Sequence, residues 1–204
     1  MDNSHFLSVR CLYILMEAYC NIEKNYEKAF NYARQLIREV EYIDTAEFPD
    51  KLDIYIKIGE LLSRFQDYEE ARIYSEEVLE DEEVAFRHYN LHQAYNLLSV
   101  IARDYDKDIE QSNEWNRKLL ALPPVNDEQQ AWKGEAWQGI ASCDLAYNLF
   151  LVGKYDEAIP YFQKGIEIMY KQEDYYFVSG SAVILADIYL IKKDLKAAKE
   201  MLDI

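Results

Sequence analysis

Apolar residues recur along the chain with the spacing of one face of a helix. In the segments that start at Tyr55, Tyr95 and Ala182 they fall at i, i+3 and i+7, which is the period of an amphipathic helix. Each of these segments carries a small residue after its second apolar position. These small residues are Gly59, Ser99 and Ala186, and Ala146 stands at the same place in a further copy. The pattern predicts a repeated helix with one narrow position on its buried face.

A second motif follows each of these helices. It reads Tyr26-Glu-Lys-Ala29, Tyr68-Glu-Glu-Ala71, Tyr155-Asp-Glu-Ala158 and Leu195-Lys-Ala-Ala198. A weaker copy, Asp108-Ile-Glu-Gln-Ser112, fits the series with one extra residue. A large residue follows each small one by three positions: Tyr32, Tyr74, Trp115, Tyr161 and Met201. This second pattern predicts a second helix in every copy.

The two motifs together predict a stack of helical hairpins. Two antiparallel helices cross closely only where their side chains are short, and Gly59 with Ala71 provides such a crossing in the second copy. One hairpin cannot bury its own apolar face, so neighbouring copies pack on each other. We therefore expect one array over residues 1–204. Its five repeats cover approximately residues 7–44, 50–84, 88–122, 127–171 and 175–204.

These motifs resemble the tetratricopeptide repeat family. The best copies are Tyr55, Ile58-Gly59, Leu62, Tyr68, Ala71 and Tyr74 in the second unit, and Tyr155, Ala158, Tyr161 and Phe162 in the fourth. The resemblance implies an all-α solenoid of ten or so helices, wound as a right-handed superhelix, that binds proteins without catalysis. The units exceed the usual ~34 residues of the family, as in the sensory arrays of some bacterial transcription regulators. Glu17 replaces the small residue of the first unit.

Composition limits the kinds of partner and the cellular compartment that we expect. The net charge is −16, which disfavours direct binding of nucleic acid and of anionic membrane surfaces. Cys11, Cys20 and Cys143 form no CxxC motif and are expected to be unpaired thiols. No apolar run approaches ~20 residues, and no signal peptide is visible. We expect a cytoplasmic protein, or a periplasmic one if a leader has been removed.

A search for catalytic and metal-binding motifs predicts neither. His88 and His92 lie one helical turn apart, but no third ligand has a suitable spacing, so they are expected to form a surface or interface pair. The acidic run from Glu76 to Glu83 is expected to be a solvated helix end. Gly153-Lys154 is expected to be a turn between two helices and not a phosphate loop. We therefore expect no enzyme activity, no metal and no cofactor.

The family resemblance also implies a partner-binding face on the first helix of each hairpin. Carried over by alignment, the positions on this face are Asn21, Lys57, Glu60, Arg64, Asn96, Arg103, Asp144, Tyr147 and Asp187. The four that are cationic or amides in the central units (Lys57, Arg64, Asn96 and Arg103) are suited to hold a carboxylate or the backbone of an extended peptide. The alternative is that these polar residues are simply the solvated face of the solenoid. Ile14 and Ala18 occupy the first-unit places of the carboxylate clamp of chaperone-binding members, so that clamp is not expected.

The last unit predicts an open end. Its second helix is short, and no further helix covers Leu195, Ala198 and Leu202. Either the chain is cut from a longer protein, or this end is buried in a homodimer. The sequence thus predicts a non-catalytic protein- or peptide-binding scaffold. The alternative is the sensory segment of a larger signalling protein or transcription regulator whose output domain lies beyond residue 204.

Overall fold

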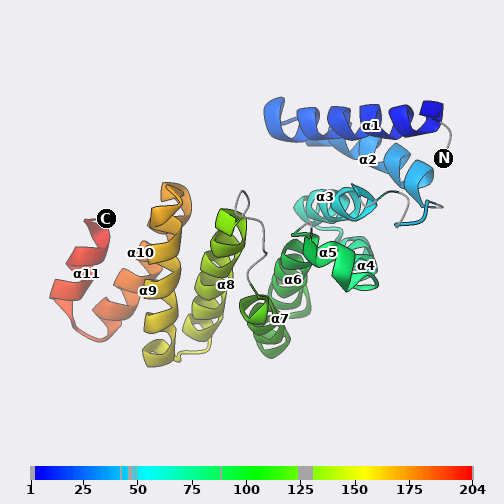
Figure 1. The fold of residues 1–204 in the computed structure, drawn as a ribbon. Coiled ribbons are helices and arrows are strands. Elements are labelled where there is room, and N and C mark those ends of the chain that lie inside the picture. The colour runs from blue at the N-terminus through cyan, green and yellow to red at the C-terminus, as the bar shows by residue number, and fades with distance from the viewer. Residues whose placement is uncertain are drawn as a thin grey trace. The chain divides into compact units, whose positions relative to one another are not determined.

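The computed structural model describes residues 3–41, 43–45, 48, 50–87, 89–123 and 131–203. The regular elements of these residues are all helices (Figure 1). Their bounds are α1 Asn3–Glu17, η1 Ala18–Ile22, α2 Tyr26–Val40, α3 Asp50–Arg64, α4 Tyr68–Leu79, α5 Glu82–Arg87, α6 Asn90–Ile101, η2 Ala102–Asp106, α7 Ile109–Ala121, α8 Ala131–Leu151, α9 Tyr155–Lys171, α10 Tyr175–Ile191 and α11 Leu195–Leu202. The predicted start of the fourth repeat, residues 127–130, lies outside the described residues.

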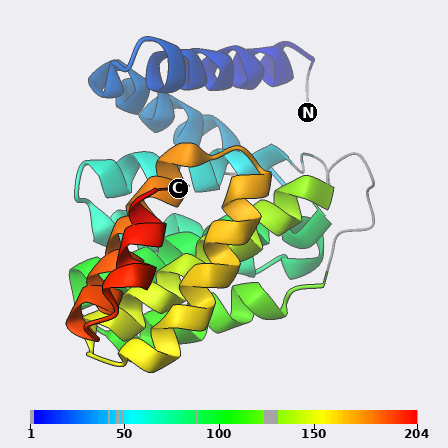
Figure 2. The ribbon, with the colours of Figure 1, turned by 90° about the vertical axis from the view of Figure 1, so that its left-hand side faces the viewer.

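The helices pack as sequential hairpins, so the all-α fold is confirmed. The chain forms two compact units, Met1–Leu97 and Leu98–Ile204. In unit 1, α1 packs on α2 and α3 packs on α4. In unit 2, each helix from α7 to α11 packs on the next one, and Figure 2 shows these helices side by side. We call α1, α3, α6, α8 and α10 the first helices, and α2, α4, α7, α9 and α11 the second helices.

One short turn recurs before four of the second helices (α2, α4, α7 and α11) and before the first helix α10. A residue with positive φ is followed by a cap whose side chain accepts a hydrogen bond from the backbone N–H three residues later. The positive-φ residues are Lys24, Gln66, Lys107, Glu173 and Lys193. The caps are Asn25, Asp67, Asp108, Asp174 and Asp194. The turn before α9 differs, because Gly153 takes the positive φ and Lys154 makes no side-chain cap. Gly153-Lys154 is therefore a helix–helix turn, as predicted.

The predicted small residues of the second helices are all buried. Ala29, Ala71, Ser112 and Ala158 have no exposed surface, and Ala198 is 2% exposed. A Cβ added to Gly59 would lie 3.3 Å from the backbone oxygen of Ala71, so α3 and α4 cross at these two residues. The close crossing predicted from the sequence is confirmed.

The first and third hairpins differ from the predicted register in two details. Helix α7 begins at Ile109 with Asp108 as its cap, so the motif before Ser112 has no extra residue. The additional residue lies earlier, in the π-helix η2, and η1 occupies the same place in the first hairpin. Gly59 lies eight residues before its cap Asp67, whereas Met16, which is buried, lies nine residues before its cap Asn25. The extra residue of η1 accounts for this difference. The small residue of the first hairpin is thus replaced by Met16 and not by Glu17.

A second close crossing, which the repeat pattern did not predict, joins α8 and α9. A Cβ added to Gly165 would lie 2.3 Å from Cys143 Sγ, 2.9 Å from the backbone oxygen of Gly139 and 3.1 Å from the backbone nitrogen of Cys143. Side chains on both helices surround this point, and Cys143, Phe162 and Met169 are all buried in the same core. The two helices therefore touch backbone to backbone near Gly165.

Candidate functional site

Four predicted site residues meet in a small recess of unit 1. Asn21 follows α1, and Lys57, Glu60 and Arg64 lie on α3. They line a space of about 40 Å³ together with Glu17 and Cys20. The register of the first helices therefore places these four side chains on one surface, as the sequence predicted.

Charges in this recess are largely paired within the chain. Lys57 Nζ donates to Glu60 Oε2 at 3.2 Å, and Asn21 Nδ2 donates to Glu17 Oε2 at 2.9 Å. Burial lowers the pKa of Lys57, but Glu60 and other nearby carboxylates outweigh burial, so the net shift is upward. Burial raises the pKa of Glu17. Lys57 is thus a charged side chain that is already paired with Glu60, and it is poorly placed to bind a carboxylate of another molecule.

Three further predicted residues line a pocket in unit 2, which we call the unit-2 pocket. Arg103 comes from η2, and Asp144 and Tyr147 come from α8. The pocket has a volume of about 460 Å³, and its other walls include Phe162, Phe177 and Gly180. Tyr176 stands at its rim with 91% of its surface exposed. Aromatic rings, an arginine and a carboxylate thus surround one opening.

Arg103 is held by neighbours on three of its sides. Its Nε and Nη2 donate to Asp104 at 2.7 and 3.1 Å, and its Nη1 donates to Asp144 at 3.4 Å. The guanidinium carbon also lies 5.3 Å from the centroid of the Tyr147 ring. Only 11% of the side chain is exposed. Arg103 therefore orders the pocket wall, and three of its five N–H donors are already used by the two carboxylates.

Two predicted site residues lie apart from both openings. Asn96 is half-buried on α6, and Asp187 is exposed on α10. Neither lines the recess of unit 1 or the unit-2 pocket.

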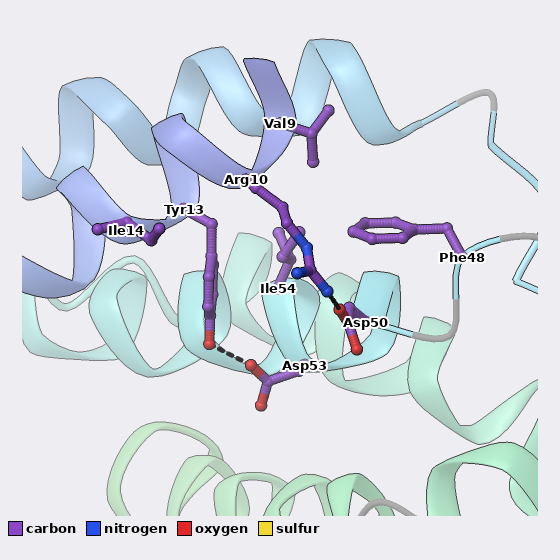
Figure 3. A pocket seen from close by; sticks show the side chains of 8 residues that line it. All are labelled: Val9, Arg10, Tyr13, Ile14, Phe48, Asp50, Asp53 and Ile54. Atoms are coloured by element: carbon purple, nitrogen blue, oxygen red, sulfur yellow. Dashed lines mark hydrogen bonds and ion pairs between the residues drawn. The ribbon is translucent and has the colours of Figure 1, made fainter. Parts of the chain in front are cut away.

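A larger pocket of unit 1, which we call the α1–α3 pocket, is lined by residues that were not predicted. Figure 3 shows Arg10 and Tyr13 reaching from α1 toward Asp50 and Asp53 on α3, with Phe48 beside them. A signal for the acidic pair was present in the sequence. Asp50 and Asp53 precede Lys57 by seven and four residues, so they continue the same helix face toward the start of α3.

The predicted histidine pair is corrected in part. His88 lies outside the described residues. His92 is only 3% exposed and packs between the rings of Phe86 and Tyr89, so it is not a surface residue. Burial lowers the pKa of His92 to about 4. It is a neutral core side chain at physiological pH.

Among the described residues, no group of side chains forms a recognisable catalytic or metal-binding site. Among them, no three His, Cys, Asp or Glu side chains gather as a metal site. Cys143 lines the unit-2 pocket, but burial raises the pKa of its thiol to about 12, so it is protonated and a poor nucleophile. None of the helices described is long and apolar enough to cross a membrane.

Comparison with known families identifies the hairpins. The tetratricopeptide repeat family matches residues 52–80 and 141–168. The first segment is the α3–α4 hairpin, and the second covers most of the α8–α9 hairpin. These two hairpins are similar to tetratricopeptide repeats. Repeats of this family generally serve as protein-binding scaffolds and are usually non-catalytic.

Solved structures show the same fold over nearly the whole chain. BtubC (BKLC) from P. vanneervenii has a TM-score of 0.70 and 16% sequence identity, covering 99% of this chain and 89% of that one. A putative kinesin light chain from Podosopora anserina with nearly identical TPR-like repeats has a TM-score of 0.67 and 16% identity, covering 100% and 94%. A variant of it gives 0.68. The comparison with curated proteins gave no match. These similarities concern the fold.

Proposed function

We propose that this tetratricopeptide repeat chain is a non-catalytic scaffold that holds a segment of a protein partner against its first helices. The observation that carries the proposal is the unit-2 pocket. Three residues assigned to the binding face from the repeat register, Arg103, Asp144 and Tyr147, line one opening of about 460 Å³. In unit 1, the recess with Asn21, Lys57, Glu60 and Arg64 is a separate opening on the first helices.

The chemistry of the unit-2 pocket is that of a protein contact. Tyrosine, tryptophan and arginine dominate the binding energy of protein interfaces because they offer large, rigid apolar area with a polar edge. Here Tyr147, Phe177 and the exposed Tyr176 surround an arginine that is already fixed by Asp104 and Asp144. The partner segment is therefore proposed to seat one large side chain among these rings.

Filling the unit-2 pocket is expected to abolish binding without unfolding the chain. Gly180 lines the pocket, and a Cβ added to it meets no atom within 4 Å. Gly180→Trp therefore projects a ring into the open space. Peptides selected from a displayed random library on the wild-type chain are expected to bind Gly180→Trp at least ~100-fold more weakly, because one anchor contact contributes about 2–4 kcal/mol. Fluorescence anisotropy measures the affinity.

Gly180→Ala is the matched control for this experiment. It changes the same position but leaves the pocket open, and it is expected to keep the wild-type affinity. Equal binding by Gly180→Trp and the wild type would contradict the assignment of this pocket. A selection that enriches no peptide would contradict the scaffold proposal itself.

We also propose that the end of unit 2 forms a homodimer. Leu190 and Ile191 of α10 and Leu195 and Leu202 of α11 are about half exposed or more. Exposure of such a group of apolar side chains to water is energetically unfavourable. Sedimentation equilibrium is expected to show a concentration-dependent dimer for the wild type and a monomer for Leu195→Lys with Leu202→Lys, since both side chains are exposed and tolerate the change.

A second candidate role is a segment of a larger signalling protein or transcription regulator. In that case the same apolar end would pack against another domain instead of a second copy. A wild-type chain that stays monomeric at every concentration would contradict the homodimer and favour this second role.

A further inference from the structure

The α1–α3 pocket has apolar walls and an acidic rim. Its volume is about 320 Å³. Val9, Phe48 and Ile54 are almost completely buried and form its apolar walls, and Ile14 is 63% exposed at its mouth. Asp50 and Asp53 come from successive turns of α3. A side chain with an apolar stem and a charged tip fits such a pocket better than a wholly apolar one.

The rim carries more negative than positive charge. Among the described residues that line the pocket, Arg10 is the one cation, and Asp50 and Asp53 are the two carboxylates. Arg10 Nη2 donates to Asp50 Oδ2 at 3.2 Å, and both side chains are more than half exposed. An exposed ion pair with a single contact is weak. Asp53 accepts a hydrogen bond from the Tyr13 hydroxyl, which occupies one of the several acceptor positions of a carboxylate.

Neighbouring groups add to this negative field. Burial raises the pKa of Tyr13, and the charges of Asp53, Glu17 and Asp50 raise it further. A neutral Tyr13 donates a hydrogen bond to Asp53 and adds no charge of its own to the rim. Lys57, one helical turn beyond Asp53, is a nearby cation that acts on Asp53 and Glu17, but it is paired with Glu60. The whole chain carries a net charge of −16, so negative charge dominates at long range.

We propose that the α1–α3 pocket binds an arginine or lysine side chain of the partner protein. The aliphatic stem of this side chain packs on Val9, Phe48 and Ile54, and its cationic head reaches Asp53 and the free side of Asp50. Arg10, which already contacts Asp50 and lies 4.9 Å from the centroid of Phe6, shows that a guanidinium is compatible with this rim. The partner segment is therefore basic and apolar, not acidic.

This inference rests on the proposed function only in naming a protein as the natural occupant. Its test uses defined peptides: acetyl-Leu-Arg-Leu-amide, the same peptide with citrulline, and the same peptide with glutamate. Citrulline has nearly the shape of arginine but no charge. The methyl NMR signals of Val9, Ile14 and Ile54 are followed during titration, because these groups line the pocket.

The arginine peptide is expected to shift these methyl signals and to bind about tenfold more tightly than the citrulline peptide, since charge-assisted hydrogen bonds are roughly twice as strong as neutral ones. Asp53→Asn is expected to weaken binding of the arginine peptide to the level of the citrulline peptide. Asparagine keeps an acceptor for the Tyr13 hydroxyl, so the fold is preserved. Glu114→Gln, which removes an exposed charge of α7 in unit 2, is the control and is expected to leave the affinity unchanged.

Equal affinity for the arginine and citrulline peptides would overturn the inference. So would tighter binding of the glutamate peptide, the absence of any methyl shift, or an Asp53→Asn variant that binds like the wild type. The result is separable from the test of the scaffold role, because Gly180 and the unit-2 pocket are not involved. The arginine peptide could bind the α1–α3 pocket while Gly180→Trp leaves binding of the selected peptides unchanged. That result would support the assignment of the α1–α3 pocket and contradict only the assignment of the unit-2 pocket.

Discussion

Gly165→Ala is expected to lower the free energy of unfolding by about 3 kcal/mol, the upper part of the range for overpacked cores. The new methyl carbon would lie 2.3 Å from Cys143 Sγ, 2.9 Å from the oxygen of Gly139 and 3.1 Å from the nitrogen of Cys143. The sulfur can rotate away, but the two backbone atoms cannot. Helices α8 and α9 must therefore separate, and the buried side chains around the crossing lose contact. Urea unfolding followed by circular dichroism measures the change.

Gly180→Ala provides the matched control for this prediction. Gly180 also lies inside a helix, α10, but a Cβ there meets nothing within 4 Å. Alanine is favoured over glycine in helices by about 1 kcal/mol, so this variant is expected to be as stable as the wild type or slightly more stable. Similar destabilisation by both variants would contradict a special close crossing at Gly165.

Ala71→Leu is expected to destabilise the chain by about 2 kcal/mol, because overpacking a filled core costs about 1–3 kcal/mol. Ala71 has no exposed surface, and its backbone oxygen lies opposite Gly59 on α3. A leucine there has no cavity to enter, so α4 must move away from α3. The midpoint of urea unfolding reports the loss.

Ala121→Leu serves as the control for Ala71→Leu. Ala121 is the last residue of α7 and is exposed. The same change of side chain is therefore expected to leave stability within about 0.5 kcal/mol of the wild type. An Ala71→Leu variant as stable as the wild type would mean that the repeat register has been assigned wrongly.

The close crossings could be predicted only where they follow the repeat. Ala29, Ala71, Ser112, Ala158 and Ala198 are recognisable because each lies at one fixed place in a recurring motif, and a helix converts that spacing into one buried face. Gly165 has no counterpart in the other hairpins. In a single sequence it is one more helix glycine, and only the three-dimensional packing of α8 on α9 reveals its contact with Gly139 and Cys143.

The register errors have a similar cause. A π-helix adds one residue to a helix end without a marked change in composition, so the one extra residue was assigned to the motif that starts at Asp108 instead of to η2. The helix caps indicate the correct register. Asn25, Asp67, Asp108 and Asp194 each stand four residues before a buried small residue. Aligning the caps first places Ser112 correctly, and Met16 follows once the extra residue of η1 is also counted.

The grouping of several residues on the proposed binding face could be predicted from the sequence, but the pairing of their charges could not. Helix periodicity places Lys57, Glu60 and Arg64 on one surface, and it places Arg103 near Asp144 and Tyr147. It does not say which donors are already used. The bonds from Arg103 to Asp104 and Asp144, and from Lys57 to Glu60, follow from side-chain conformation. These bonds change the expected partner from an acidic to a basic segment.

The central claim, that a partner segment lies on the first helices, is tested most directly by photo-crosslinking. A library-selected peptide that carries a benzophenone at its anchor position would be irradiated with the wild-type chain, and mass spectrometry would locate the crosslinked residues. The account predicts crosslinks at the unit-2 pocket, on Tyr147 of α8 and on Tyr176 and Phe177 of α10. Crosslinks confined to the second helices α9 and α11 would contradict it.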